Sequence, residues 1–341
     1  MKVTFFTRRI DKSDARSGAI HDWAAKLAER VEWLYVICLE KGKTDLPANA
    51  EVFVLGKGKV RRIFNFLRKG PKVIWKSDAI FCHMYPVYTI MCAPFTKLFR
   101  KRLVTWHAHA TVTIKLKIAH ALTDEIVTST PNAFKIRSKK VKVVGQGINT
   151  DYFAPPKKTN NKYVLLAVGR ITQVKKYETL IKAASILVKH GIKNLEFRIV
   201  GGTVYPKDEI YLKELKKLIE KLGVSKNVKF IGPVPHEKLA SQYQDCEIFV
   251  SSTPTGSFDK AVLEAMACAR PIVTCNDSFG EIGVRHLFKE GDAEDMADKI
   301  KLLFSMPPVE RNKLGLGYRE IIKKDHNMES LMDKIVEELK K

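Results

Sequence analysis

The sequence lacks the glycine-rich loops that mark two large classes of nucleotide-binding protein. No GxxxxGK[ST] stretch occurs, which excludes a P-loop. No GxGxxG follows an expected strand, which argues against a dinucleotide-dependent oxidoreductase. The cysteines show no CxxC or CxxH spacing, and each lies in or beside an apolar stretch. We therefore expect reduced core thiols of a cytosolic protein, and neither a zinc site nor a disulfide framework, at Cys38, Cys82, Cys92, Cys246, Cys268 and Cys275.

Long apolar runs are also missing. The longest stretch without Lys, Arg, Asp or Glu is Ala79–Thr96, and Pro86 and Pro94 interrupt it, so it cannot form one membrane-spanning helix. No signal peptide is expected, because Met1–Phe6 already predicts a strand and Arg8 follows soon after. These absences predict a cytoplasmic protein.

Acidic residues are scarce in the first half of the chain. The formal net charge is +23, of which residues 1–155 carry +16 and residues 156–341 carry +7. Between Val52 and Thr123, fourteen basic residues accompany a single acid, Asp78. A one-sided positive field attracts nucleic acid, an anionic membrane surface or phosphorylated substrates, and charge alone does not choose among them.

The 341 residues suit two domains, and apolar runs of four to seven residues alternate with amphipathic helices. This pattern predicts two α/β domains with doubly wound, Rossmann-like parallel sheets. Breaks at Asp151–Lys162 and Ser305–Val309 divide the chain. We expect a first domain at residues 1–155, a second domain at 156–310 and a helical tail at 311–341, for which packing back on the first domain is one arrangement.

Ligands in such folds bind beside the carboxyl ends of the strands, so the loops there are the first place to expect a site. Gly169 and Arg170 end an expected strand, and Lys175 precedes the next helix. Gly169 permits a sharp turn, while the two cations near a helix N-terminus favour a diphosphate. The alternative is a pair of ordinary solvated basic residues.

A second candidate loop runs from Ser251 to Ala267 and leads into a helix. Glu264 lies one turn into that helix, where its carboxylate can accept two hydrogen bonds from hydroxyls, as in ribose binding. The alternative is a surface ion pair between Lys260 and Glu264, which are four residues apart.

Together these segments resemble one family. Their order and spacing are similar to those of the retaining glycosyltransferases of the GT-B fold, glycosyl transferases group 1 (glycosyltransferase family 4), and the resemblance covers nearly the whole chain. The stretches that carry it are Val144–Pro155, Val168–Arg170 with Lys175, Phe230–Val234, Glu264–Cys268, Arg270–Val273 and Lys289–Asp292.

The resemblance implies a transfer of a hexosyl-type sugar from a nucleotide-diphosphate donor, with two Rossmann-like domains facing a cleft. It also implies that residues 1–155 form the acceptor-binding domain and residues 156–310 the nucleotide-sugar-binding domain. Arg170 and Lys175 would neutralise the donor diphosphate, Glu264 would bind the ribose, and the stretch ending at Val234 would line the base. The family needs no metal for this reaction, and the sequence contains no Asp-x-Asp motif. The retaining outcome is likewise implied, and we expect a same-face mechanism because no carboxylate is assignable as a nucleophile.

The chain departs from the family pattern before the helix glutamate. The family usually has a glutamate that contacts the donor sugar where this chain has Gly256, and the following residues up to Lys260, including Phe258, are unusual. We hypothesise that Asp259 takes over part of the sugar contact. Lys260 either selects an acidic sugar such as a uronate or pairs with Glu264. A non-catalytic relative also stays open.

The first domain offers weaker candidates. Gly18 remains of the family's glycine-rich loop near the donor phosphates, and His107 ends a strand where the family commonly has a histidine facing the donor sugar. His83 follows a similar strand and is a candidate for the acceptor side. For both histidines the alternative is a purely structural role.

Two cationic segments indicate where the acceptor lies. Lys59–Lys69 predicts an amphipathic helix, and Phe95–Leu103 also mixes aromatic with basic residues. Such segments suit an anionic leaflet, so we expect a lipid-linked or other anionic acceptor on the inner face of the cell membrane, as in cell-envelope glycan synthesis. In the alternative, the apolar stripe of the first segment, which consists of Val60, Ile63, Phe64 and Leu67, packs on the domain's own sheet.

Three other functions fit parts of the sequence. A soluble glycosyltransferase with a small acceptor and a non-catalytic relative share the fold. A nucleic-acid-binding protein would explain the charge, but RRM, KH, helix-turn-helix and zinc-finger signatures are missing, so no nucleic acid is expected as a partner.

Overall fold

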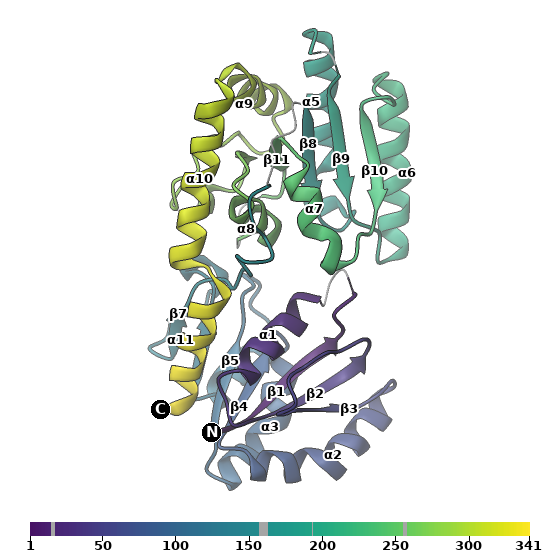
Figure 1. Ribbon diagram of the computed structural model, residues 1–341. Helices are drawn as coiled ribbons and strands as arrows, with labels where there is room; N and C mark the ends of the chain where they lie inside the picture. The colour runs from purple at the N-terminus through teal and green to yellow at the C-terminus, as the bar shows by residue number, and fades with distance from the viewer. Residues whose placement is uncertain (15–17, 157–162, 193, 255–257) are drawn as a thin grey trace. The chain divides into compact units, whose positions relative to one another are not determined.

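The computed structural model describes residues 1–14, 18–156, 163–192, 194–254 and 258–341. These residues form two compact units (Figure 1). The first unit comprises Met1–Asn149, Pro235–Glu237 and Asp325–Lys341, and the second comprises Thr150–Val234 and Lys238–Lys324. Each unit is built around its own parallel sheet, so the prediction of an α/β fold with two doubly wound sheets is confirmed.

The first unit contains a seven-stranded sheet in the order β3-β2-β1-β4-β5-β6-β7, with every described strand pair parallel. The strand bounds are β1 Lys2–Ile10, β2 Trp33–Lys41, β3 Ala50–Val54, β4 Ala79–His83, β5 Arg102–Trp106, β6 Glu125–Thr128 and β7 Val141–Val143. Its helices are α1 Gly18–Ala28, α2 Lys59–Lys76, α3 Pro86–Leu98, α4 Ile114–Leu122 and, from the end of the chain, α11 Met328–Lys340.

Neighbouring residues of β1 show how helices cover both faces of this sheet. Phe5 belongs to a core cluster shared with α1 and α11, whereas Phe6 belongs to a cluster shared with α2 and α3. Side chains alternate between the faces of a strand, so both positions must be apolar when both faces are covered. The central strand β4, with the sequence AIFCH, is accordingly buried at every residue.

Helix α2 buries one stripe and exposes another. Phe66, Gly70, Val73 and Ile74 face the core. Five other apolar side chains of the helix are exposed: Val60 by 83%, Ile63 by 56%, Phe64 by 65%, Leu67 by 57% and Trp75 by 61%. The alternative in which the stripe Val60–Leu67 packs on the unit's own sheet is therefore wrong. We refer to these five exposed residues as the α2 face.

The second basic segment is less apolar at its surface. Phe95 stacks edge-on against Phe66, with ring centroids 5.8 Å apart, and Phe99 packs against the same core cluster. Leu98 is the large apolar side chain of Phe95–Leu103 that is exposed, by 72%. Of the two segments, α2 carries most of the exposed apolar surface.

The second unit contains a five-stranded parallel sheet in the order β10-β9-β8-β11-β12. Its strands are β8 Val164–Val168, β9 Glu196–Val200, β10 Val228–Gly232, β11 Ile248–Ser251 and β12 Ile272–Thr274. Its helices are α5 Tyr177–Lys189, α6 Pro206–Lys221, α7 Leu239–Gln244, α8 Lys260–Ala267, α9 Ala293–Ser305 and α10 Pro308–Asp325.

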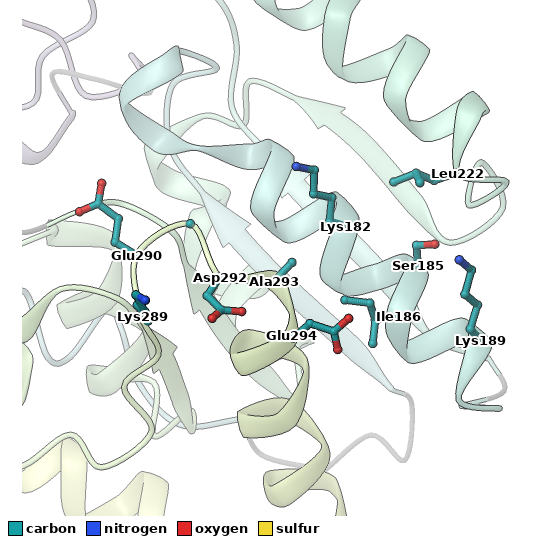
Figure 2. A pocket seen from close by; sticks show the side chains of 11 residues that line it. Lys182, Ser185, Ile186, Lys189, Leu222, Lys289, Glu290, Asp292, Ala293 and Glu294 are labelled. Atoms are coloured by element: carbon teal, nitrogen blue, oxygen red, sulfur yellow. The ribbon is translucent and has the colours of Figure 1, made fainter.

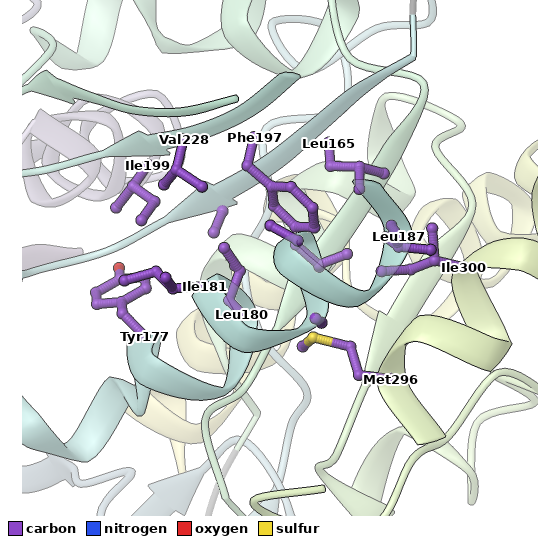
Figure 3. Close-up of a cluster of buried hydrophobic side chains, with 14 of the residues drawn as sticks. Leu165, Tyr177, Leu180, Ile181, Leu187, Phe197, Ile199, Val228, Met296 and Ile300 are labelled. Atoms are coloured by element: carbon purple, nitrogen blue, oxygen red, sulfur yellow. The ribbon is translucent and has the colours of Figure 1, made fainter. Parts of the chain in front are cut away.

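The core of this unit forms where α5 and α9 pack against the sheet (Figure 3). Leu180 and Leu187 of α5 meet Phe197 of β9 there, and Met296 and Ile300 of α9 close the same cluster. All five side chains are fully buried. The carboxyl ends of β8 and β11, where the candidate site begins, are therefore held on a rigid base.

Two further sequence expectations concern thiols and membrane spans. All six cysteines are free and buried, as expected for core thiols. Among the helices of the described residues, none combines the length and the apolar character that a membrane crossing requires.

Candidate functional site

The strand order of the second unit reverses between β8 and β11. These strands are neighbours, yet the chain leaves β8 toward β9 on one side and leaves β11 toward β12 on the other. In doubly wound sheets this reversal of order is where the strand-exit loops diverge and ligands bind. Gly169 and Arg170 follow β8, and Ser252 follows β11, so both sequence candidates lie at this point.

Close backbone packing requires a glycine after β9, next to the loop that follows β8. Gly201, at the end of β9, lies so near that a Cβ on it would be 1.9 Å from the carbonyl oxygen of Gly169. A Cβ on Gly169 would in turn lie 2.8 Å from Cε of Lys175. The hydroxyl of Tyr177 donates to the Gly169 carbonyl at 3.1 Å. The loop from β8 to α5 is thus folded tightly, and it brings Lys175 back over the end of the strand.

Lys175 is joined to the second candidate loop by an ion pair. Its ammonium lies 2.8 Å from Oδ2 of Asp259, and the two side chains are 19% and 9% exposed. Ser252 strengthens the link, because its hydroxyl donates to the carbonyl oxygens of Lys175 and Lys176 at 2.7 and 3.0 Å. The two loops therefore form one polar cluster at the carboxyl ends of β8 and β11.

The carboxylate of Asp259 is the centre of that cluster. Oδ2 also accepts hydrogen bonds from Ser251 at 3.1 Å and Thr253 at 3.0 Å, and Oδ1 accepts from the backbone N–H of Ala261, which caps α8. Burial by itself raises the pKa of Asp259, but the charge of Lys175 and these hydrogen bonds outweigh it and hold the pKa below 3.8. Asp259 therefore stays ionised and keeps Lys175 oriented.

Glu264 is buried on α8, with 5% of its surface exposed. The hydroxyl of Tyr243 donates to its Oε2 at 2.7 Å. Lys260 lies 3.9 Å from Oε1. The ion pair that we gave as the alternative is therefore present, but its glutamate is buried and does not lie at the surface.

Three other predicted donor residues lie in the second unit. Arg170 is exposed at the end of β8. Val234 is half-buried just beyond β10, and the ring of Phe258 packs against Phe279 with centroids 5.0 Å apart. Gly256 lies outside the residues that the structure describes. The structure thus brings Gly169, Lys175 and Asp259 together.

The candidates of the first unit also lie at the carboxyl edge of their sheet. Its strand order reverses between β1 and β4; Gly18 follows β1 and begins α1, and His83 ends β4. Gly18 is buried, and a Cβ there would lie 2.4 Å from Cβ of His236. His83 packs edge-on against Trp23, with ring centroids 5.0 Å apart.

His107 directly follows β5 and is 7% exposed. Its Nδ1 lies 3.0 Å from the carbonyl oxygen of Met84, so Nδ1 donates and Nε2 carries the lone pair. Burial lowers the pKa of His107 below 6.5, which keeps the ring neutral at pH 7. Within the described chain, no hydrogen-bond partner reaches Nε2. A neutral, buried acceptor of this kind suits a hydroxyl ligand.

A cavity of about 590 Å³ lies elsewhere in the second unit, beside α5 and the segment that begins α9 (Figure 2). Lys182 and Lys189 of α5 line it together with Glu290, Asp292 and Glu294. The predicted donor residues are not among those that line it, and its mixed charge favours no anion. In the described parts of the chain, no group of three His, Cys, Asp or Glu residues is arranged to hold a metal ion.

Sequence reasoning missed three hydrogen-bond donors of these carboxylates, namely Ser251 and Thr253, which donate to Asp259, and Tyr243, which donates to Glu264. Tyr243 lies in α7, where nothing in the local sequence distinguishes it from other apolar positions of a helix. The run Ser251-Ser252-Thr253 directly after a strand was the available signal, because hydroxyls at a strand exit are free to hydrogen-bond the neighbouring loop.

Comparison with known proteins places these features in context. The family model described as "Glycosyl transferases group 1" matches residues 149–320. A D-inositol 3-phosphate glycosyltransferase of Corynebacterium jeikeium is 29% identical over 167 residues, covering 44% of this chain and 39% of that protein. A mannosylfructose-phosphate synthase of Agrobacterium fabrum is 25% identical over 168 residues, covering 44% of this chain and 37% of that protein. The match thus spans less than two fifths of each of these relatives.

Among solved structures, Anabaena Alr3699/HepE in complex with UDP and glucose superposes with a TM-score of 0.81 at 17% identity, over 100% of this chain and 99% of that one. This likeness concerns the fold alone and agrees with the expected GT-B architecture. The family model, by contrast, extends over half of the chain and includes the segments that carry Gly169, Lys175 and Glu264, so the chain belongs to the glycosyl transferases group 1 family.

Proposed function

We propose that this protein transfers a sugar from a nucleotide-diphosphate donor to an acceptor, with retention of configuration and without a metal ion. The observation that carries the proposal is the polar cluster at the carboxyl ends of β8 and β11, which holds the ammonium of Lys175. Helix α8, which follows the second loop of this cluster, carries the buried carboxylate of Glu264. The structural neighbour solved with UDP and glucose supports this type of donor.

In this proposal Lys175 and Arg170 stabilise the leaving diphosphate. Breaking the bond between sugar and phosphate leaves a negative charge on the phosphate oxygen, and fixed cations lower the barrier because they need not reorganise during the reaction. Asp259 fixes the Lys175 ammonium before the donor arrives. In a same-face mechanism the leaving phosphate takes the proton of the acceptor hydroxyl. His107 contributes as a neutral acceptor for a sugar hydroxyl.

Donor binding is tested by a thermal-shift screen with UDP, GDP, ADP, NADH and a set of nucleotide sugars. Ligand at about 100 times its dissociation constant stabilises a protein by roughly 2.7 kcal/mol, which is readily seen. We expect one nucleoside diphosphate to raise the melting temperature of the wild type, and to do so far less in Lys175→Ala and Glu264→Ala. A flat response of the folded wild type to every nucleotide would instead favour a non-catalytic relative.

We further propose that the acceptor is an anionic or lipid-linked glycan and that the protein docks on the inner membrane surface through α2. The α2 face exposes five large apolar side chains. Helix α2 has no acidic residue and also carries seven cations, namely Lys59, Arg61, Arg62, Arg68, Lys69, Lys72 and Lys76. Apolar side chains framed by cations fit the interface of an anionic leaflet, where each cation contributes about 1 kcal/mol.

Membrane docking is tested by co-sedimentation with vesicles of phosphatidylcholine, with and without phosphatidylglycerol. We expect binding to the anionic vesicles and weaker binding by the double variant Phe64→Ser/Leu67→Ser, which removes apolar side chains and leaves every charge in place. Leu302→Ser, at a residue of α9 that is 51% exposed, is the matched control. Equal binding by all three proteins would rule out α2 as the docking element.

A soluble transferase with a small phosphorylated acceptor is the second candidate function. The names of the two curated relatives, an inositol 3-phosphate glycosyltransferase and a mannosylfructose-phosphate synthase, favour it. Product analysis separates the two candidates: sugar transferred to inositol phosphate or a hexose phosphate in the absence of lipid supports the soluble enzyme, and transfer that requires lipid extract supports the membrane-bound one.

A further inference from the structure

The buried carboxylate of Glu264 has a dedicated hydrogen-bond donor in Tyr243. Tyr243 lies near the C-terminus of α7 and has no exposed surface, and its hydroxyl lies 2.7 Å from Oε2 of Glu264. A hydrogen bond to a charged acceptor is about twice as strong as one between neutral groups. Such a bond fixes the plane of the carboxylate as well as its position.

Two phenylalanines keep the tyrosine ring in place. The ring of Phe153 packs edge-on against Tyr243, and that of Phe249 in β11 packs against it at an angle, with centroid distances of 5.6 Å in both cases. Phe153 and Phe249 are each 1% exposed. The ring that carries the hydroxyl is therefore held between close-packed side chains.

The hydroxyl also stays protonated over the whole physiological range. Burial raises the pKa of Tyr243 well above its ordinary value of 10.0, and the neighbouring charge of Glu264 acts in the same direction. Tyr243 consequently remains a donor whenever Glu264 is ionised.

We infer that Tyr243 is a positioning residue, which presents the carboxylate of Glu264 to the two hydroxyls of the donor ribose. The inference rests on the proposed role of Glu264 in ribose binding. A glutamate side chain has three rotatable bonds, and a ligand that must order them loses affinity in proportion. With Oε2 held by Tyr243, the carboxylate is ordered before the nucleotide binds. The resulting gain in affinity depends on the ribose hydroxyls, because they are the groups that the carboxylate contacts in this proposal.

The test compares ligands that differ only in the ribose. Calorimetry measures the dissociation constants of UDP, GDP and ADP, of their 2′-deoxy and 3′-deoxy forms, and of inorganic pyrophosphate, for the wild type and Tyr243→Phe. For the nucleotide that the wild type prefers, we expect Tyr243→Phe to weaken binding of the ribose form about tenfold, or about 1.4 kcal/mol. The deoxy forms and pyrophosphate should change far less, so discrimination between ribose and deoxyribose is lost.

Two further proteins separate positioning from a general loss of structure. Tyr318→Phe removes the hydroxyl of another buried tyrosine, which accepts from the backbone of Arg285, and should leave all the constants unchanged. In a Glu264→Ala background, Tyr243→Phe should add little, because the two groups act through one contact.

Equal weakening of ribose, deoxyribose and pyrophosphate binding by Tyr243→Phe would overturn the inference, and so would an unchanged preference for ribose. If the folded wild type binds no nucleoside diphosphate at all, the proposed function itself fails. The two failures are therefore distinguishable.

Discussion

At the scale of single residues, the candidate site is a set of buried polar groups that hold one another. Asp259 forms an ion pair with Lys175 and accepts hydrogen bonds from Ser251, Thr253 and the backbone N–H at the start of α8. A buried carboxylate with this many partners stabilises the fold only while it is ionised. Acidification therefore tests the cluster without any ligand.

Asp259→Asn should flatten the dependence of stability on acid pH. The folded pKa of Asp259 lies below its ordinary value of 3.8, so the ionised form stabilises the protein above about pH 4. That contribution is lost as the pH falls from about 4 through the folded pKa. Melting temperatures measured from pH 7 to pH 3 should show the variant less stable at pH 7 and less sensitive to acid.

Asp298→Asn is the control for this experiment. Asp298 forms an ion pair with Lys301 at 2.7 Å on the surface of α9, where water screens the interaction. Its curve should follow that of the wild type. A curve for Asp259→Asn that is parallel to the wild type down to pH 3 would show that the Asp259–Lys175 pair does not couple stability to protonation.

At the scale of elements, α10 packs so closely on the end of α8 that one of its glycines has no room for a side chain. A Cβ on Gly315 would lie 2.0 Å from the carbonyl oxygen of Ala269, which is backbone and cannot move aside. Gly317 lies two residues further along the same helix, and a Cβ there would have no neighbouring atom within 4 Å.

The two glycines should respond to alanine in opposite directions. Gly317→Ala should stabilise the protein by about 0.5–1 kcal/mol, because alanine is the better helix former. Gly315→Ala should destabilise it by about 1–3 kcal/mol through overpacking. Urea midpoints measure both effects, and stabilisation by Gly315→Ala would show that α10 does not pack on α8 as described.

Helix α11 comes from the end of the chain and completes the core of the first unit. Met328, Leu331, Met332 and Ile335 belong to the same cluster as Val3 and Phe5 of β1. Arg30, just after α1, fixes the helix from outside through ion pairs with two of its acidic residues, Glu329 at 2.6 Å and Asp333 at 2.7 Å.

Ile335→Ala should therefore destabilise the first unit by about 2–5 kcal/mol, the usual cost of such a cavity. Ile335 has no exposed surface. Glu337→Ala, two residues away on the exposed side, should stay within about 0.5 kcal/mol of the wild type. Urea unfolding followed by the fluorescence of Trp23 and Trp106, both in this unit, is the measurement. Equal midpoints for the two variants would contradict the docking of α11.

At the scale of the whole molecule, charge is the dominant property. The net charge of +23 is concentrated in residues 1–155, and α2 combines part of it with the exposed α2 face. Long-range attraction by charge is screened by salt, whereas apolar insertion is not. The two contributions to membrane binding can therefore be separated by ionic strength.

Binding to anionic vesicles should weaken steeply between about 0.1 M and about 1 M salt, because the Debye length falls from about 10 Å to about 3 Å. The variant Phe64→Ser/Leu67→Ser should lose binding almost completely at the higher concentration, while the wild type retains part of it. Co-sedimentation at several salt concentrations provides both curves. Salt-independent binding by the wild type would contradict a role for its charge.

Much of the fold was predictable because its determinants are local in the sequence. The amphipathic helix predicted at Lys59–Lys69 forms the first part of α2, Lys59–Lys76, since its apolar residues repeat at helical spacing. Helix α3 was not predicted. Pro86 at its first position is compatible with a helix start, and packing of Tyr88 and Cys92 in the core overrides the helix-breaking signal of Pro94. Helix α9 was also missed, although Met296, Ile300 and Leu303 carry the same spacing.

The positions of the candidate site were predictable to a lesser degree. Gly169 and Lys175 lie on a loop that leads from a strand into a helix, and Glu264 lies one turn beyond such a loop. The family resemblance then distinguished these three residues from ordinary surface residues. Their partners did not stand out. Tyr243 is a core tyrosine in sequence, and Asp259 was expected to contact a sugar, a role that stays a prediction beside its observed bond to Lys175.

The sequence by itself determined the alternation of strands and helices, the two parallel sheets and the loops at which to look, because apolar spacing and turn residues act over a few positions. Only the tertiary structure decided that Lys175 pairs with Asp259, 84 positions away, and that Tyr243 donates to Glu264. It also decided that α11 packs in the core of the first unit and that the α2 face is exposed. Each of these depends on which distant segments share a surface, and local pattern does not encode that choice.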